Sequence, residues 1–430
     1  MRKTLLTALS LFPAFALASG YSLPNVNPRD LSLAGAAVAA QVDSGAALAM
    51  PAALARQSGW YVRIGSSALN LFDVWNDPTG AVPDDEIDLV FTPLPALSVS
   101  YGGKIAALGD RGWGVGLGFE PFGGGAVTWP DGWEGRYRIL TVDQKVLRGA
   151  LSAGFEVLPM LRVGAGVVYY YTFEELSQNL CISCFAIAGA PDATAELAAQ
   201  GGAITFDVSA EFDVPGVPLR IAVDYKHEGK QTLEGDLKWS GVPSGVAALV
   251  PIARDQDVEH EVTVPSSLNV GIAYRVAKPL NLMFTYTFDR WEVYQEDLFV
   301  GSEPGAELAV ERNYGNGHTF RAGAEYDASP ALQLRIGVHR DISGLDTDTY
   351  SPSLPDASSW AVTAGAGYRF GKGFSVDAGV FYAFMDEVTS TNNGSEPSLG
   401  SPLPTGSFRG TYEIAALIYG LSIGWTPGAK

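Results

Sequence analysis

The sequence feature that most constrains the fold is a strict two-residue alternation between positions 320 and 384. In the four runs 320–326, 332–338, 360–370 and 374–384 every second residue is apolar, whereas the residues between them are small, polar or charged. A period of two indicates β-strands with two different faces. Aromatic residues stand near the ends of these runs, and the second face carries charges that a packed core would not accept without partners. The pattern predicts an all-β, transmembrane antiparallel β-barrel with lipid outside and a polar lumen.

The first 18 residues have the features of a secretory signal peptide. Arg2 and Lys3 precede an apolar run, and the run ends in the small-residue cleavage site Ala16-Leu17-Ala18. We therefore expect the mature protein to begin at Ser19. After this position no run of about 18 apolar residues free of charge occurs, so no membrane helix is expected.

The charge composition limits the classes of binding partner that the protein can have. Charged residues make up 17% of the chain, below the usual share of about a quarter. The net charge of −19 argues against nucleic acid, whose phosphates need a basic face. The acidic runs 292–311 and 341–356 are expected to be solvated outer loops. Bridging by divalent cations to the anionic glycolipid of the outer membrane is the alternative for these two runs.

The chain divides into a short plug and a long barrel. Residues 19–58 lack the alternation and are rich in Ala and Gly, so we expect short helices and turns inside the lumen, as an N-terminal hatch. Residues 59–430 are expected to form about 14 strands, joined alternately by short Pro-, Gly- and Ser-rich turns and by long outer loops. The expected strands are 59–71, 96–107, 112–120, 145–158, 160–173, 202–214, 217–240, 258–276, 279–298, 315–328, 331–342, 358–370, 374–387 and 409–425.

Two outer loops carry unusual residues. In 185–201, Asp192 is a candidate N-cap before an Ala/Glu/Leu run, and 246–253 is strongly apolar where a loop is normally polar. Exposed apolar loop surface favours a ligand or partner, and the alternative explanation is that the two loops pack on each other. Cys181 and Cys184 form a C-I-S-C motif, which in an oxidising compartment predicts a local disulfide, and no second cysteine pair completes a metal site.

Several motifs occur in a fixed order along the mature chain. They are 33–36, Asp43 and 50–55 near the start, then 114–118, 121–123 and 133–136, and finally 265–271, 321–326, 351–356 and 365–370. In this order they resemble the FadL/TodX family of outer-membrane channels for long-chain fatty acids and aromatic hydrocarbons. The resemblance implies a barrel of fourteen strands plugged by an N-terminal hatch, a hydrophobic capture groove between two outer loops, and an exit into the membrane through a kinked third strand.

The resemblance also implies roles for individual residues. One departure is Met50, which stands where the family has Asn, so a gate that depends on this Asn would be altered. The implied hatch and gate residues are Asp43, Met50, Pro51 and Ala52; the implied groove residues are Phe185, Ile187, Leu197, Val246, Leu249, Val250 and Ile252; the implied lateral exit is Gly123, Gly124 and Gly125.

The expected function is passive transport of hydrophobic molecules, most of all long-chain fatty acids. A fatty acid needs an apolar pocket with one or two cationic donors. Most lumen-facing cations are expected to pair with lumen acids, and Arg321 or Arg335 is the candidate left for a ligand. A neutral aromatic hydrocarbon would need no such cation and is the alternative substrate.

An enzyme is not expected. The four histidines are scattered, and no G-x-S-x-G or comparable nucleophile motif accompanies them, which argues against a lipid hydrolase. No metal, cofactor or nucleotide-binding loop is expected. The tail 426–430 runs past the terminal aromatic position that bacterial barrels usually present to the barrel-assembly machinery.

Bilayer conductance separates the plugged channel from a general porin for small polar solutes. Because residues 19–58 are expected to close the lumen, the purified protein should be nearly silent in a planar lipid bilayer. A large, steady open-pore current would instead support the porin.

Overall fold

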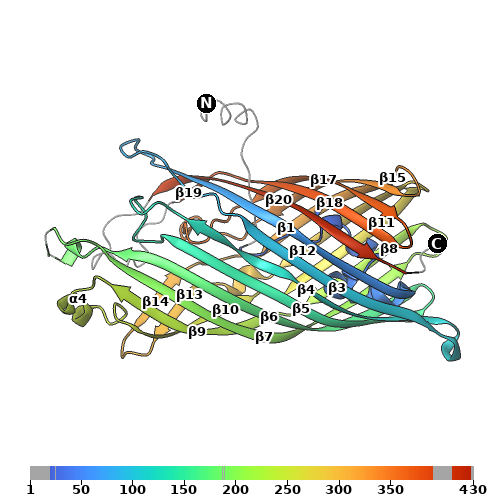
Figure 1. Ribbon diagram of the computed structural model, residues 1–430, viewed down its shortest axis with the longest axis horizontal. Helices are drawn as coiled ribbons and strands as arrows, with labels where there is room; N and C mark the ends of the chain where they lie inside the picture. Colours follow the sequence, from blue (N-terminus) through green and yellow to red (C-terminus); the bar gives the residue numbers. More distant parts are fainter. Residues whose placement is uncertain (1–19, 25, 186, 188, 391–408, 428–430) are drawn as a thin grey trace.

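The computed structural model describes residues 20–24, 26–185, 187, 189–390 and 409–427. The predicted signal peptide, 1–18, lies outside the described residues. Over the described ranges the chain forms a closed antiparallel barrel of 14 strands, as predicted (Figure 1). The barrel closes where β1 (Gly59–Asn76) pairs with β20 (Gly410–Trp425), from Val62 opposite Trp425 to Asn76 opposite Thr411.

The remaining segments follow the chain around the barrel, with long connections at one end and short turns at the other. They are β3 (Thr92–Ile105), β4 (Arg111–Thr128), β5 (Thr141–Leu158), β6 (Leu161–Leu180), β7 (Ala193–Asp213), β8 (Leu219–Lys226), β9 (Gly229–Ser240), β10 (Gln256–Val264), β11 (Ser267–Ala277), β12 (Leu280–Asp289), β13 (Glu296–Gly301), β14 (Glu307–Glu311), β15 (Gly317–Asp327), β16 (Leu332–Ile342), β17 (Ser359–Phe370) and β18 (Phe374–Met385), with two short pieces, β2 (Asp85–Glu86) and β19 (Val388–Ser390). Four of the 14 barrel strands consist of two segments each: β8 with β9, β10 with β11, β12 with β13, and β14 with β15.

The alternation between positions 320 and 384 places apolar side chains on the outside. Val338 lies opposite Val362, and Tyr326 lies opposite Leu334, so the outward positions of β15–β17 form a continuous apolar surface. Ile336 is exposed on that surface, and Leu421 on β20 and Ile204 on β7 are exposed at outward positions elsewhere on the barrel. A band of this kind faces lipid in a transmembrane barrel.

Three strands that were predicted to be continuous are interrupted. The expected strand 217–240 is two strands, β8 and β9, which both pair with β7 but have different second neighbours, β11 and β10. The expected strand 258–276 breaks at Pro265, because proline has no N–H to donate to a ladder. The expected strand 279–298 ends at Asp289, and the chain resumes as the β13–β14 hairpin beside β10. This hairpin occupies much of the acidic run 292–311, which was predicted to be a loop.

The expected helix in 185–201 is also wrong. Residues from Ala193 onward belong to β7, where Ala195, Leu197 and Ala199 point inward and pair with β6 and β9. Alanine and leucine fit either structure, and pairing on both sides outweighs their helix propensity. In the second loop a short helix does form, α4 (Ser244–Leu249).

The N-terminal residues fill part of the lumen, as a plug. They form α2 (Pro28–Leu31), η1 (Val38–Ala40), α3 (Ala46–Ala49) and η2 (Pro51–Arg56), which are buried almost throughout. In Figure 1 these short helices lie inside the barrel, towards the end that carries the short turns. No helix in the described part of the chain is long and apolar enough to cross a membrane.

Hydroxyl groups of the barrel wall bind the backbone of the plug. The Ser209 hydroxyl accepts a hydrogen bond from the Ala52 N–H at 2.9 Å, and the Ser152 hydroxyl donates to the Ala47 carbonyl at 2.7 Å. The plug has too little regular structure to satisfy its own backbone, and buried backbone groups need partners. The wall therefore supplies the hydrogen bonds that the short helices lack.

Close approach to the wall depends on glycine at a few positions. A Cβ on Gly114 in β4 would lie 2.3 Å from the backbone oxygen of Leu54 in η2. Gly149 in the neighbouring strand β5 has no such contact, since the closest atom to its Cβ position is 3.9 Å away. The backbone of η2 can therefore lie this close to β4 only because residue 114 is a glycine and has no side chain.

Gly114→Ala should displace η2 and destabilise the protein by about 1–3 kcal/mol, the usual cost of overpacking. The matched control Gly149→Ala should change stability by less than about 0.5 kcal/mol. The midpoints of heat unfolding in detergent test the difference. Equal midpoints for the two variants would contradict the close plug–wall contact.

Candidate functional site

A strap formed by residues 20–24 crosses the lumen. The Leu23 N–H donates to the Phe122 carbonyl at 2.9 Å, and the Gly124 N–H donates to the Tyr21 carbonyl at 2.7 Å. The Tyr21 hydroxyl donates to the Thr263 carbonyl, and its ring packs edge-on against Trp291 at 5.0 Å. Ser22 and Leu23 line a cavity on each side of the strap, so the strap separates an outer from an inner cavity.

One end of the strap is bound by a loop carboxylate. The Gly20 N–H donates to Asp356 at 2.9 Å, and the Ser343 hydroxyl donates to the same oxygen at 2.7 Å. Both partners lie in the long connection between β16 and β17. Burial raises the pKa of Asp356 to about 7.

The outer cavity lies at the long-loop end and has a volume of about 200 Å³, far more than the about 10–15 Å³ that one water molecule requires. Its walls come from β1, β4–β7, β9, β10, β13 and β14 together with the strap and the loop 351–355. The apolar side chains that line it include Leu69, Leu71, Val127, Ile139, Val142, Leu176, Leu197, Leu237, Ile252, Val258, Phe299, Leu308 and Val310. A pocket with this lining is suited to an apolar ligand.

A buried charged cluster forms one wall of the outer cavity. His260 lies between Glu174, 2.9 Å from Nδ1, and Asp297, 3.4 Å from Nε2. Asp297 also accepts hydrogen bonds from the Tyr294 hydroxyl at 2.8 Å and from Arg312 Nε at 2.7 Å. Each charge in this cluster contacts an opposite one, so the cluster presents no uncompensated charge to a ligand.

The cluster lies beyond the membrane-facing band. The outward residues of β9 and β10 beside it, such as Lys230, Glu234 and Glu259, are charged and exposed, which hydrocarbon would not accept. Burial alone would lower the pKa of His260, but the carboxylates of Glu174 and Asp297 raise it to about 10. Burial alone would raise the pKa of Asp297, but Arg312 and His260 hold it below its usual value.

The inner cavity lies between the strap and the plug and has a volume of about 160 Å³. Its floor includes Gly35 and Val38 of the plug, and its walls come from β4–β6, β8, β11, β12 and β15–β18. Two cations in this wall form ion pairs: Arg148 with Glu120, and Lys226 with Asp224. The third, Arg321, donates to the Thr287 hydroxyl.

The two arginines that sequence analysis proposed for a ligand differ in their surroundings. Arg335 is held by two carboxylates, Glu325 at 2.8 Å and Asp377 at 2.6 Å, and it does not line the inner cavity. Arg321 lines the cavity, and within the described residues no carboxylate oxygen lies within 4.0 Å of its guanidinium nitrogens. Arg321 is therefore the better placed of the two to contact a ligand.

The groove residues expected from the resemblance do not lie together. Leu197 and Ile252 line the outer cavity. Phe185, Val246 and Val250 pack in a separate cluster with Leu180 and Ile182, where the two outer loops contact each other. These three residues therefore follow the alternative given in the sequence analysis, in which the two outer loops are apolar because they pack on each other. Ile187 and Leu249 are exposed, Leu249 to 74%.

The three glycines expected at the lateral exit lie where β4 is irregular. The register with β5 shifts between Pro121 and Gly123, and Gly124 has a φ of 97°. Ser22 of the strap forms a β-bridge to Gly123, and Gly124 and Gly125 line the outer cavity. The strap thus lies against the irregular part of β4.

The four expected hatch residues lie in contacts between plug and wall. Asp43 forms an ion pair with Arg63 of β1 at 2.8 Å. Met50 and Pro51 are buried between the plug helices and the wall, and Ala52 donates its N–H to Ser209. Asp43 also accepts the Gly45 N–H at 2.8 Å, so its contacts fix a plug turn to the wall.

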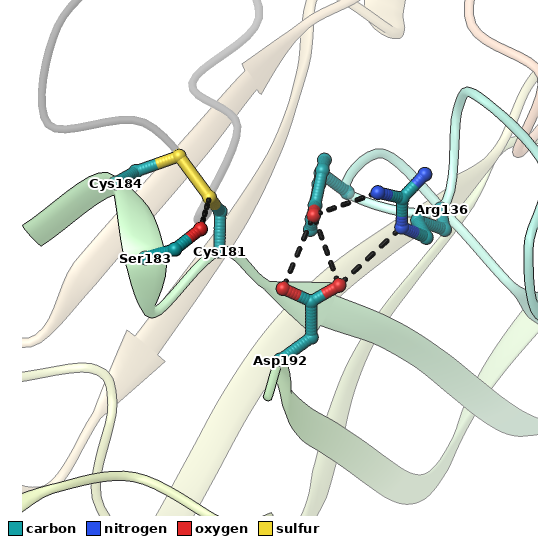
Figure 2. The surroundings of a disulfide bond; sticks show 6 residues. Arg136, Cys181, Ser183, Cys184 and Asp192 are labelled. Atoms are coloured by element: carbon teal, nitrogen blue, oxygen red, sulfur yellow. Dashed lines mark hydrogen bonds and ion pairs between the residues drawn. A yellow bond between two sulfur atoms is a disulfide. The ribbon is translucent and has the colours of Figure 1, made fainter. Parts of the chain in front are cut away.

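Cys181 and Cys184 form a disulfide in the connection between β6 and β7 (Figure 2). Close to it, Asp192 accepts hydrogen bonds from Arg136 Nε at 3.3 Å and from the Tyr137 hydroxyl at 2.9 Å. Asp192 therefore joins two outer loops instead of capping a helix. Among the described residues no group of three or more His, Cys, Asp or Glu side chains is arranged to hold a metal ion.

Sequence analysis missed the strap and the charged cluster. Tyr21 contacts residues more than 200 positions away, and no local pattern encodes such contacts. His260 and Asp297 occupy inward positions of β10 and β13. Strand parity therefore identifies them as lumen-facing but does not show that they contact each other.

A family model described as "Outer membrane protein transport protein (OMPP1/FadL/TodX)" matches residues 9–426. A long-chain fatty acid transport protein of Escherichia coli is 23% identical over 168 residues, which are 39% of this chain and 36% of that protein. The curated relatives are thus matched over about two fifths of their length or less.

Two solved structures share the fold. A FadL homologue of Pseudomonas aeruginosa has a TM-score of 0.82 and 20% identity, covering 95% of this chain and 99% of that chain. The toluene transporter TodX of Pseudomonas putida has a TM-score of 0.68 and 15% identity, covering 91% of this chain and 95% of that chain. At these identities the similarity concerns the fold.

His260 should remain protonated from about pH 6.5 to about pH 9, since its pKa is about 10 in the folded protein and about 6.5 in an unfolded chain. Its raised pKa contributes stability that is fully present below about pH 6.5 and is lost as the pH rises through about 10. The ¹³Cε1 chemical shift of His260, assigned with His260→Gln, tests the charge. A titration midpoint near neutral pH would contradict the cluster geometry.

Proposed function

The chain belongs to the outer membrane protein transport family that includes FadL and TodX, and from this membership we propose that it carries long-chain fatty acids passively through its lumen. The observation that supports the proposal best is the outer cavity, a mainly apolar chamber at the long-loop end of a polar barrel. Apolar molecules cross the glycolipid layer poorly, and a lipid-free path of this kind removes that barrier. Neither catalysis nor a cofactor is part of this proposal.

The proposed route has three stages. A ligand enters the outer cavity from the long-loop end, passes the strap and leaves the barrel sideways at the irregularity of β4. The strap contacts Phe122, Gly123 and Gly124, so passage and exit involve the same few residues. Lateral exit delivers an apolar molecule directly into the membrane.

A neutral aromatic hydrocarbon is the second candidate substrate. In the His260 cluster of the outer cavity's wall each charge contacts an opposite one, so this part of the wall would accept a neutral ligand as well as an acid tail. The choice between them is therefore expected to depend on the inner cavity. Surrounding glycolipid and the barrel-assembly machinery are further proposed partners.

Substitution of one cavity-lining leucine tests the proposal. Leu197→Asn places an amide in the outer cavity and should weaken binding of palmitate to the detergent-purified protein by roughly tenfold, because lost apolar contact is worth about 25 cal/mol per Å² and the amide must be desolvated. Leu249→Asn is the matched control, since Leu249 is exposed, and it should leave affinity unchanged.

Isothermal titration with palmitate and competition by toluene provide the measurement. If toluene displaces bound palmitate and the protein shows no preference for palmitate, the result favours the hydrocarbon channel. If the wild-type protein bound neither ligand, or if both variants behaved alike, the proposed transport through the outer cavity would be wrong.

A further inference from the structure

The ladder between β3 and β4 ends well before the two strands do. The strands pair up to Leu97 opposite Phe119. Beyond that point β3 still pairs with β1 over residues 92–96, and β4 still pairs with β5 over residues 120–128. Among the described strands, neither stretch has a second neighbour. The barrel wall therefore contains a gap at the long-loop ends of β3 and β4, the wall gap, which these two stretches border.

Prolines stand at the positions where the ladder would continue. Extending its register by two residues would place Pro95 directly opposite Pro121, and extending it by four would place Pro93 opposite Gly123. Hydrogen-bonded and non-hydrogen-bonded pairs alternate in an antiparallel ladder, and β3 keeps its register with β1 across both of its prolines. The nitrogens of Pro93 and Pro95 therefore face the β4 side, where they have no N–H to donate.

The Pro95–Pro121 position ends the ladder for a chemical reason. A hydrogen-bonded pair in an antiparallel ladder exchanges two N–H···O bonds, and two opposed prolines can supply neither. Past this position β4 turns into the lumen. Pro121 has the same outward parity as Phe119, which is 38% exposed, but Pro121 is buried and lines the inner cavity. The two strands therefore diverge where the prolines stand.

A small cavity lies at the fork between the diverging strands. Its volume is about 20 Å³, and its lining includes Ala96 and Leu97 of β3, Phe119 and Glu120 of β4, and Leu48 of the plug. Side chains therefore do not fill the wall completely at the point where the ladder ends.

The free edge of β3 lies at the level of the apolar band. Ser66 of β1 pairs with Pro95 on one side and with Leu421 of β20 on the other, and Leu421 is exposed at an outward position. An unpaired N–H in hydrocarbon has no water to bind and is therefore costly. Because Pro93 and Pro95 have no N–H, this edge can remain unpaired in the membrane at a lower cost than with other residues.

The edge of β4 is covered by the strap instead of by β3. Ser22 forms a β-bridge to Gly123, and the Leu23 N–H donates to the Phe122 carbonyl at 2.9 Å. A Cβ on Gly123 would collide with the backbone oxygen of Tyr21, so this glycine allows the strap to approach. The strap therefore lies on the lumen side of the wall gap.

We propose that Pro95 and Pro121 are positioning residues that hold the wall gap open, so that an apolar ligand leaves the barrel between β3 and β4 through a standing opening that the strap covers from the lumen side. The inference rests on the proposed function and makes its last stage more specific. The prolines keep the wall open, and Gly123 serves the contact with the strap. Exit then requires movement of the strap and no break in the ladder of the wall.

Restoring the two missing N–H groups tests the proposal. In the double variant Pro95→Val/Pro121→Val both facing positions can donate, and valine favours strands, so the ladder should extend past Leu97 and close the wall gap. Uptake of radiolabelled palmitate by cells that express the variant as their sole fatty acid transporter should fall roughly tenfold or more, while the palmitate affinity of the purified protein stays within about twofold of wild type. Each single variant restores one N–H and should lie between.

Two further measurements isolate the role of the wall. Hydrogen–deuterium exchange should show slow exchange of the new amides at positions 95 and 121, as expected for paired amides. The matched control Pro330→Val alters an exposed proline in the turn between β15 and β16 and should leave uptake unchanged. Retained affinity shows that the double variant is folded, since a misfolded barrel would lose binding and uptake together.

The outcomes separate the inference from the function on which it rests. Slow exchange, lost uptake and retained affinity support the standing opening. Fast exchange at positions 95 and 121 would show that the prolines do not end the ladder, and slow exchange with normal uptake would show that the ligand leaves elsewhere. Either result overturns the inference and leaves the proposed transport intact. If the wild type itself neither binds nor takes up palmitate, the proposed function is wrong as well.

Discussion

The contact between plug and wall is the interaction on which the rest of the structure depends. Short helices such as α3 and η2 leave many backbone groups without an internal partner, and burial in a lumen denies them water. Wall hydroxyls such as Ser152 and Ser209 replace that water, and glycines such as Gly114 allow the two backbones to approach. The plug fits the wall only where these small residues occur. Cavities remain where the wall instead carries large or charged side chains.

This division explains why the two cavities differ in chemistry. The outer cavity lies beyond the plug, and its lining is mainly apolar; its polar residues include the His260 cluster, in which each charge contacts an opposite one. The inner cavity lies between the strap and the plug, and its lining includes Arg148, Lys226 and Arg321.

The fold could be predicted from the sequence because its strongest signal is local. In β15–β18 each strand shows the two-residue period, and pairing follows from chain order. Local signals fail where one segment suits two structures, as for Ala195 and Leu197, which fit a helix or a strand until β6 and β9 pair with them. They also fail for the site, because Arg321 and Arg335 look alike in sequence. Their difference arises from Glu325 and Asp377, which lie close to Arg335 only in the closed barrel.

The strap is held to the barrel wall by hydrogen bonds and by the aromatic ring of Tyr21. Its backbone bonds to β4 are the pair between Leu23 and Phe122 and between Tyr21 and Gly124, and each such bond contributes about 0.5–1.5 kcal/mol net. Tyr21 adds an aromatic contact with Trp291 of about 0.5–1.5 kcal/mol beyond its area. The Gly20 N–H and the Tyr21 hydroxyl add hydrogen bonds to Asp356 and to the Thr263 carbonyl, so several separate contacts hold the strap in place. Because the same residues complete the irregular part of β4, release of the strap would expose both the inner cavity and the glycines of the wall in a single step.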